Sequence, residues 1–156
     1  MKKTNAIRIL DQLKVGYEVF QYQYDSENLS VEKIASENGL DIEDIYKTLV
    51  AKGDKNGVQV AVIRGNQNLD FKALSKVSQN KKITLVPVKD LLQLTGYIRG
   101  GCSPIGMKKS YPVYIDSKAI TGDQIYINAG ARGLLVKLNV DDLVKVTKGK
   151  VEQISL

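Results

Sequence analysis

Thr95-Gly96-Tyr97-Ile98-Arg99-Gly100-Gly101-Cys102-Ser103-Pro104-Ile105-Gly106 is the densest local signal in this 156-residue chain, and we call it the glycine loop. It holds four of the 13 glycines and one of the three prolines. Glycine permits close backbone approaches that a Cβ forbids, and proline restricts itself and its predecessor. A shaped loop is expected, whose Gly-Gly pair can bring N–H groups to a phosphate or a developing oxyanion. Composition alone favours the alternative, a tight turn between two strands.

The composition is that of an ordinary globular protein, with 43% apolar and 26% charged residues. The length predicts a single domain over residues 1–156, which can bury a core without disulfides or metals. The net charge of +6 favours a polyanionic partner such as nucleic acid. No secretory signal or membrane span is recognisable, so we expect a cytoplasmic protein with no membrane partner.

The chain has no histidine and one cysteine. These counts exclude Ser-His-Asp and Cys-His catalysis, histidine-ligated metals and multi-cysteine zinc sites. An enzyme of this composition must rely on lysine, carboxylates, hydroxyls, the backbone or the substrate itself. We therefore expect neither a metal nor a cofactor.

Apolar spacing and capping residues predict the helices. They follow caps at Thr4 or Asn5, Ser30, Asp70 and Asn139, with a short turn after Asp41 and a further helix over 88–94. The inward faces carry Ala6, Ile9, Leu10 and Leu13 in the first helix, Val31, Ile34 and Ala35 in the second, and Phe71, Leu74 and Val77 in the third.

Stretches rich in β-branched and aromatic residues predict the strands. They cover residues 17–24, 46–51, 58–63, 83–86, 111–116, 124–128 and 133–138, with a last strand or tail at 151–156. An Asn56-Gly57 step predicts a hairpin between the second and third strands. Hairpins mixed with helices, rather than repeating strand–helix units, indicate the α+β class.

Three motifs resemble those of one family. The pattern T-G-Y-x-x-G-G-x-S-P-x-G at 95–106 is similar to the signature loop of the YbaK/EbsC family of aminoacyl-tRNA deacylases, which resemble the editing domain of bacterial prolyl-tRNA synthetase. Residues 46–50, Y-K-T-L-V, resemble the family's F-K-T-L-V motif, and residues 128–133, N-A-G-A-R-G, its S-A-G-x-R-G loop. The resemblance covers nearly the whole chain and implies a mixed, barrel-like sheet flanked by helices.

The resemblance implies a catalytic set of Lys47, Gly101 and Tyr24. Lys47 matches the family's key active-site lysine, and its ammonium would hold a phosphate of the terminal adenosine or polarise the ester. Gly101 would face the oxyanion and Tyr24 would orient the aminoacyl group. From the sequence pattern alone, a solvent-facing strand position for Lys47 and a half-buried one for Tyr24 are the simpler interpretations.

The resemblance also implies substrate-binding residues. Cys102 replaces a small aliphatic residue and is expected to be a pocket wall rather than a nucleophile. Asn128 replaces a common Ser, which leaves amino-acid selectivity open, and Asp142 matches a family acid but could equally cap a helix as the capping-box partner of Asn139. Arg132 is expected either to contact a phosphate or to shape its turn. The full set is Gly100, Cys102, Ser103, Asn128, Gly130, Arg132 and Asp142.

The function implied is that of a trans-editing aminoacyl-tRNA deacylase that removes cysteine from mischarged Cys-tRNA(Pro). The opening T-N-A-x-R-x-L of residues 4–10 resembles that branch of the family. Without histidine or an evident nucleophile, the substrate's own thiol is expected to attack its ester carbonyl. The expected partner is mischarged tRNA(Pro), with prolyl-tRNA synthetase as a candidate partner.

Two alternatives remain open at this point. The first is a deacylase for another small amino acid, such as Ala-tRNA(Pro). The second is a non-catalytic module that binds tRNA or a synthetase. Arg99, Lys81-Lys82 and Lys108-Lys109 could form a basic surface toward tRNA, although such pairs commonly serve solubility.

Overall fold

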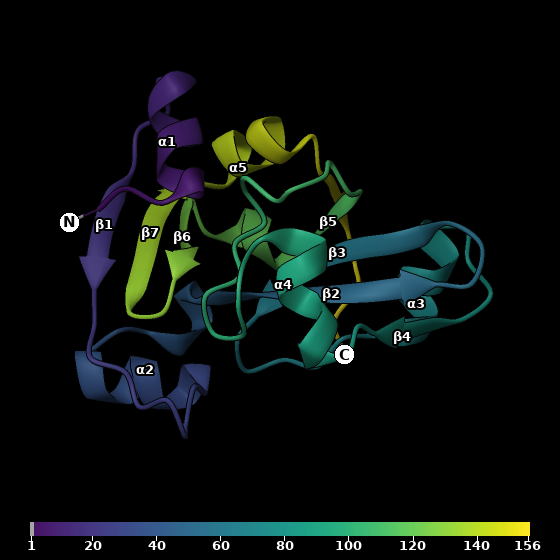
Figure 1. Cartoon of the computed structure of the whole chain (residues 1–156), viewed down its shortest axis with the longest axis horizontal. Helices are drawn as coiled ribbons and strands as arrows, with labels where there is room; N and C mark the ends of the chain where they lie inside the picture. Colours follow the sequence, from purple (N-terminus) through teal and green to yellow (C-terminus); the bar gives the residue numbers. More distant parts are fainter. Residues whose placement is uncertain (1) are drawn as a thin grey trace.

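The computed structural model describes residues 2–156. It contains two β-sheets, which meet near the middle of the molecule (Figure 1). The three-stranded sheet has the order β1 (Glu18–Gln21), β7 (Leu134–Asn139) and β6 (Gln124–Ala131), all antiparallel. The five-stranded sheet has the order β4 (Ile83–Leu85), β2 (Tyr46–Gly53), β3 (Gly57–Arg64), β5 (Val113–Asp116) and β8 (Lys150–Glu152).

The five-stranded sheet is mixed, because β2 pairs antiparallel with β3 and β4 while β5 pairs parallel with β3 and β8. A parallel bridge between Ile45 and Tyr126 connects the two sheets. The expected α+β class, with a mixed sheet flanked by helices, is confirmed. Over residues 2–156 it takes the form of two sheets rather than one closed barrel.

The helices begin where the local sequence predicts. The Thr4 hydroxyl accepts a hydrogen bond from the Ile7 N–H, Ser30 from Lys33 and Asp70 from Ala73. The helices are α1 (Asn5–Gln12), α2 (Val31–Asn38), α3 (Phe71–Val77), α4 (Val88–Thr95) and α5 (Val140–Thr147), with short 3₁₀ turns η1 (Ile42–Asp44) and η2 (Ser117–Thr121). No helix within residues 2–156 is long and apolar enough to cross a membrane.

Several details differ from the sequence-based expectations. Leu13 lies beyond the end of α1 and is 57% exposed, and Ile7 occupies the buried face in its place. Phe71, at the first position of α3, is also exposed. The first strand ends at Gln21 rather than Tyr24, and η2 was not predicted. The Asn139 side chain makes no capping hydrogen bond, so the expected capping box is not formed.

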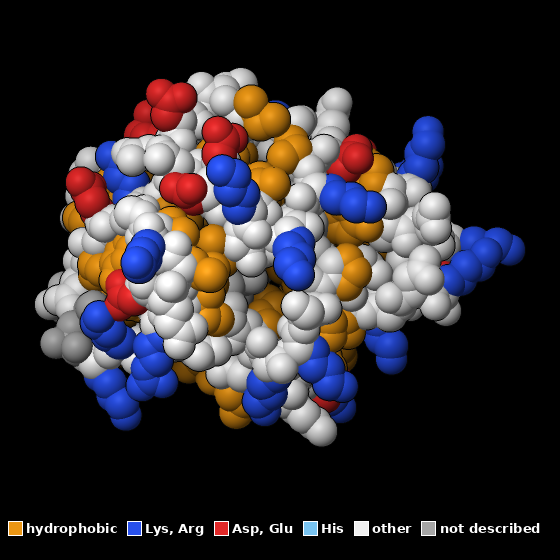
Figure 2. Space-filling view, turned by 90° about the horizontal axis from the view of Figure 1, so that it is seen from above, with side chains coloured by type: hydrophobic (Ala, Val, Ile, Leu, Met, Phe, Trp, Pro, Cys, Tyr) orange, Lys and Arg blue, Asp and Glu red, His pale blue; other side chains and the backbone are white. Residues whose placement is uncertain are grey.

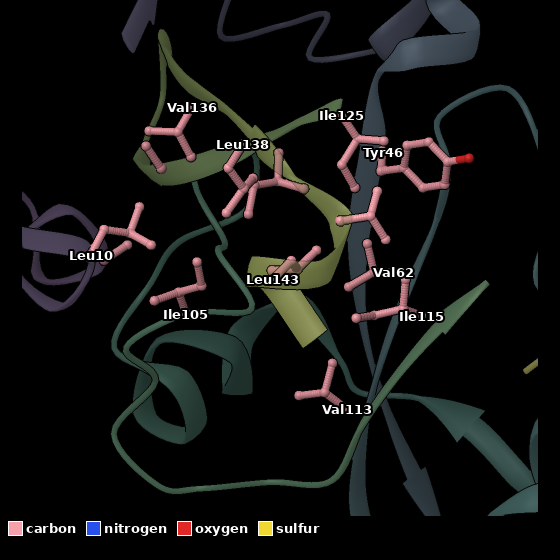
Figure 3. Packing of buried hydrophobic residues seen from close by; sticks show 14 of the residues in the cluster. Leu10, Tyr46, Val62, Ile105, Val113, Ile115, Ile125, Val136, Leu138 and Leu143 are labelled. Carbon is pink, nitrogen blue, oxygen red and sulfur yellow. The ribbon is translucent and has the colours of Figure 1, made fainter. Parts of the chain in front are cut away.

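One apolar core joins the two sheets. It contains Leu10 of α1, Leu143 of α5 and Ile105 of the glycine loop, together with strand residues from both sheets. In Figure 3 these side chains converge, while the Tyr46 hydroxyl points away from the aliphatic groups. The same core therefore positions the glycine loop relative to β2 and β6.

A buried carboxylate fixes the end of the chain. Asp116, fully buried at the end of β5, accepts hydrogen bonds from the N–H groups of Ile154 (2.9 Å), Ser155 (3.1 Å) and Lys118 (3.2 Å). The Lys118 ammonium in turn donates to the Ser155 hydroxyl at 2.9 Å. These bonds satisfy backbone donors that would otherwise be buried without acceptors.

Candidate functional site

The glycine loop connects α4 to β5, so the alternative of a tight turn between two strands is wrong. Gly100 and Gly106 adopt positive φ angles of 82° and 79°, which side chains other than glycine rarely accept. Inside the loop, the Tyr97 hydroxyl donates to the Ile105 carbonyl at 2.7 Å. This hydrogen bond joins the two ends of the glycine loop and stabilises its shape.

Asn128 fastens the glycine loop to a bulge in β6. Its amide nitrogen donates to the carbonyls of Gly100 (2.8 Å) and Ala131 (3.2 Å). Its amide oxygen accepts from the N–H groups of Gly130 (2.7 Å) and Ala131 (3.2 Å). Because both donors and the acceptor are engaged, this side chain is placed to shape the loop rather than to bind a substrate directly.

Gly101 allows a close approach between two backbones. A Cβ on Gly101 would lie 3.0 Å from the Arg132 nitrogen and 3.1 Å from the Ala131 carbonyl carbon. Its own N–H donates to the Ile98 carbonyl at 2.9 Å, so in this structure that group is not free for an oxyanion. Within residues 2–156, the N–H groups of Gly100 and Cys102 on either side make no hydrogen bond.

A cavity of about 470 Å³ lies between α2, the start of β2 and the glycine loop, and we call it the first cavity. Its lining combines apolar side chains, two acids and two cations. The residues are Tyr22, Glu27, Asn28, Leu29, Ser30, Val31, Glu32, Ile34, Ile45, Tyr46, Lys47, Thr48, Leu49, Gly65, Arg99, Gly100, Cys102, Asn128 and Leu135.

Lys47 reaches the first cavity from β2, where it pairs across the hairpin with Ile63. It is half-buried, and burial lowers the pKa of its ammonium, while the negative charge of Glu32 acts weakly in the opposite direction. Within residues 2–156 it forms no ion pair within 4.0 Å. Beside it, the buried hydroxyl of Thr48 has no hydrogen-bond partner in the same part of the chain. The Lys47 ammonium therefore remains available to a ligand, whereas the Thr48 hydroxyl oxygen is covered by the protein.

Cys102 lines the first cavity as a buried side chain. Burial raises the pKa of its thiol to about 12. Since the thiolate is the nucleophilic form, this side chain is a poor nucleophile near neutral pH.

Tyr24 lies outside the first cavity. It is 51% exposed and lines a second cavity, of about 590 Å³, together with Arg132. Tyr22, two residues earlier, lines both cavities, and burial raises the pKa of its hydroxyl.

The other expected site residues do not line the first cavity. The buried Ser103 hydroxyl accepts from the Ile105 N–H at 3.2 Å inside the loop. Gly130 has a φ of 100°, and a Cβ there would lie 2.8 Å from the Tyr97 ring. Asp142 sits in the first turn of α5. Thus Lys47, Gly100, Cys102 and Asn128 together line the first cavity, whereas Gly101 and Asp142 do not.

Comparison with known proteins identifies the family. A family model described as "Aminoacyl-tRNA editing domain" matches residues 26–146. The chain belongs to this family. It is also 44% identical over 154 residues to a protein of Enterococcus faecalis (strain ATCC 700802 / V583) named "Putative Cys-tRNA(Pro)/Cys-tRNA(Cys) deacylase EbsC", covering 99% of this chain and 94% of that protein.

Two further relatives of this editing domain are more distant. The uncharacterized protein YwhH of Bacillus subtilis (strain 168) is 24% identical over 129 residues, covering 83% of this chain and 82% of that protein. A crystal structure described as "a putative trans-editing enzyme for prolyl tRNA synthetase" superimposes with a TM-score of 0.83 at 20% identity, covering 100% of this chain and 99% of that one. The superposition shows that the editing-domain fold is shared.

The sequence analysis did not predict several residues that line the first cavity, notably Tyr22, Glu32 and Thr48. In the strand expected over residues 17–24, Tyr22 and Tyr24 would share one face, so the sequence pattern could not separate them; in the structure, β1 ends at Gln21, before both. Thr48 directly follows Lys47 in the quoted Y-K-T-L-V motif, so it is the only one of the three that the sequence could have indicated as a cavity residue. Glu32 belongs to a helix whose approach to Lys47 depends on tertiary packing.

The positive charge of the editing domain is not gathered in one patch on the face that carries α1 and α5. Figure 2 shows Lys and Arg side chains spread over that face, with Asp and Glu side chains between some of them. Arg99 is the only member of the proposed basic surface that lines the first cavity. In residues 2–156, no group of three or more Cys, Asp or Glu side chains is arranged to hold a metal ion.

Proposed function

We propose that this editing domain is a trans-acting deacylase that removes cysteine from mischarged Cys-tRNA(Pro), working as one domain over residues 1–156. The observation that carries the proposal is the first cavity, which Lys47 and the glycine loop line together. The 44% identity to a protein named as a Cys-tRNA deacylase supports the reaction class and substrate. The substrate would be met in the cytoplasm, where tRNA is charged.

The chemistry uses the substrate's own thiol as nucleophile. Its sulfur bonds to the ester carbonyl carbon, the ester C–O bond breaks, and the thiol proton passes to the departing ribose oxygen. The products are free tRNA and a small cyclic thioester, which water then opens to cysteine. This route fits a chain with no histidine and with a Cys102 thiol whose pKa burial raises to about 12.

The protein contributes position and charge. The Lys47 ammonium anchors the ester end of the substrate, and the unpaired N–H groups of Gly100 and Cys102 receive the developing oxyanion. This assignment moves the oxyanion role from Gly101 to its two neighbours.

The first test follows the decay of Cys-tRNA(Pro), Ala-tRNA(Pro) and Pro-tRNA(Pro) with and without the protein. We expect selective loss of the cysteinyl ester, and Lys47→Ala should slow that loss by about 100-fold or more, as removal of one transition-state donor does. Lys52→Ala is the matched control, because Lys52 is an exposed residue of the same strand and does not line the first cavity.

Other outcomes would replace parts of the proposal. Loss of the alanyl ester instead would retain a deacylase but remove the substrate thiol from the mechanism. Persistence of all three esters with folded protein would favour a module that binds tRNA or prolyl-tRNA synthetase without catalysis. Equal activity of Lys47→Ala and Lys52→Ala would remove Lys47 from the chemistry.

A further inference from the structure

A small cavity, which we call the polar cavity, lies between η1, the end of β3, η2 and the start of β6. It encloses about 190 Å³ and shares only Tyr46 with the first cavity. This volume is below the roughly 300–1,000 Å³ of sites for larger ligands, so it suits a molecule of few heavy atoms. Its lining includes two cations and two carboxylates, those of Arg64, Lys118, Glu43 and Asp44.

The four charged side chains do not neutralise one another directly, because none of them forms an ion pair within 4.0 Å in residues 2–156. The enclosed Nε of Arg64 has no acceptor there, so the pairing of this cation falls to its terminal nitrogens. A guanidinium is suited to hold a carboxylate through two parallel hydrogen bonds. The Lys118 ammonium donates once, to the Ser155 hydroxyl, which leaves two of its three donors.

Tyr46 adds a hydroxyl to the same cavity. The residue is 3% exposed, and in Figure 3 its hydroxyl points away from the aliphatic core. Burial raises the pKa of this hydroxyl, while Arg64, its partner across the β2–β3 hairpin, acts in the opposite direction. The O–H donates to no acceptor within residues 2–156, unlike those of Tyr97 and Tyr111, which bond to carbonyls. The family's F-K-T-L-V motif has phenylalanine here, so the hydroxyl distinguishes this chain from that motif.

The two kinds of charge lie at different depths. Arg64 and Lys118 are half-buried, whereas Glu43 and Asp44 are exposed residues of η1. We propose that the polar cavity binds a small free α-amino acid as its zwitterion. The carboxylate lies inward, against Arg64 and the Tyr46 hydroxyl, and the ammonium lies outward, toward the carboxylates of η1. A simple anion would leave the two acids without a partner, and a simple cation would leave the guanidinium without one.

The first test measures the binding of free L-alanine to the full chain by isothermal titration calorimetry, without tRNA. Propionate lacks the ammonium and L-alaninamide lacks the carboxylate, while both stay close to alanine in size. We expect each to bind at least about tenfold more weakly than alanine, because one charged contact is lost. Equal binding of propionate and alanine would overturn the zwitterion, and no binding of alanine at millimolar concentrations would overturn the site.

Variants locate the bound alanine. Tyr46→Phe removes only the hydroxyl and should weaken alanine binding about tenfold. Arg64→Gln should weaken it by about as much or more, whereas Arg8→Gln, which removes the same charge from an exposed position of α1 outside this cavity, should bind as the wild type does. The double variant Glu43→Gln/Asp44→Asn should abolish the preference for alanine over propionate.

Lys47→Ala separates this site from the first cavity, because Lys47 does not line the polar cavity. Alanine binding that is lost in Lys47→Ala but kept in Tyr46→Phe and Arg64→Gln would place the amino acid in the first cavity and overturn the inference. Thermal melts confirm that each variant is folded. Since no ester takes part, failure of deacylation would leave this inference standing, and failure of alanine binding would leave the deacylase proposal standing.

Discussion

At the scale of single residues, the surroundings of Lys47 determine the pKa of its ammonium and its availability to a substrate. It is half-buried on a rigid strand, and burial disfavours its charged form, which lowers its pKa. Glu32 counteracts only part of this effect and forms no ion pair with it. An ammonium left without a protein counter-ion is ready to meet the negative charge of a substrate.

The lowered pKa of Lys47 predicts an alkaline limit to activity. The active ammonium is fully present below its folded-state pKa and is lost as the pH rises through that value, which lies below the ordinary 10.5. The enzyme-dependent rate, after subtraction of spontaneous ester hydrolysis, should therefore fall at a lower pH than the titration of an exposed lysine would give.

Lys47→Arg provides the comparison, because a guanidinium stays charged throughout this range. Any activity that this variant retains should lack the alkaline limit, while the substrate thiol titrates identically in both proteins. An identical alkaline limit in both would assign it to another group and contradict the prediction.

At the scale of elements, the site depends on contact between the glycine loop and the turn after β6. Gly101 makes this contact possible, since a Cβ there would lie only 3.0–3.2 Å from backbone atoms of Ala131 and Arg132, closer than side-chain carbons normally approach. Two backbones cannot yield as a flexible side chain can. The loop and the strand must therefore shift apart by about a few tenths of an ångström if a side chain is added.

Gly101→Ala should consequently lower the free energy of unfolding by about 1–3 kcal/mol and reduce deacylation, because the loop is displaced from the first cavity. Urea unfolding followed by circular dichroism measures the first effect. Gly16→Ala is the control, since a Cβ there meets nothing within 4 Å. If the two variants unfold alike, the proposed close approach is not important for stability.

Elements were predictable from sequence where their causes are local. Thr4, Ser30 and Asp70 each bond to an N–H group three residues ahead, so short patterns reveal these helix starts. The use of Gly101 and Asn128 depends on groups about 30 residues away in sequence. Sequence reasoning therefore identified the loop and its partner motif, but assigned the Gly101 N–H and the Asn128 amide to substrate. In the structure, the Gly101 N–H donates to the Ile98 carbonyl, and the Asn128 amide bonds to the backbone of the loop and the bulge.

At the scale of the whole molecule, the chain end is tied to the centre of the five-stranded sheet. Asp116 belongs to β5, an inner strand, and it binds the backbone of Ile154 and Ser155 from beyond β8. The last residues also pair with the segment before α3 through a bridge between Leu69 and Ser155. The final residues thus form part of the folded structure, which the sequence left open as a strand or a tail.

Asp116→Ala should destabilise the protein by about 3 kcal/mol, because buried N–H groups lose a charged acceptor. The measurement is the free energy of unfolding in urea. Asp123→Ala is the control, since the Asp123 carboxylate is exposed and makes no hydrogen bond in residues 2–156. Equal stability of the two variants would show that the carboxylate does not hold the chain end.

The four hydrogen bonds of the Asn128 amide have a consequence for discrimination among amino acids. A loop fastened before the substrate arrives loses little conformational entropy on binding, so it need not close around its target. If the first cavity receives the aminoacyl group as proposed, its shape is set before the substrate binds. Amino acids too large for it should then be excluded, and the choice among the small ones should depend on their own reactivity.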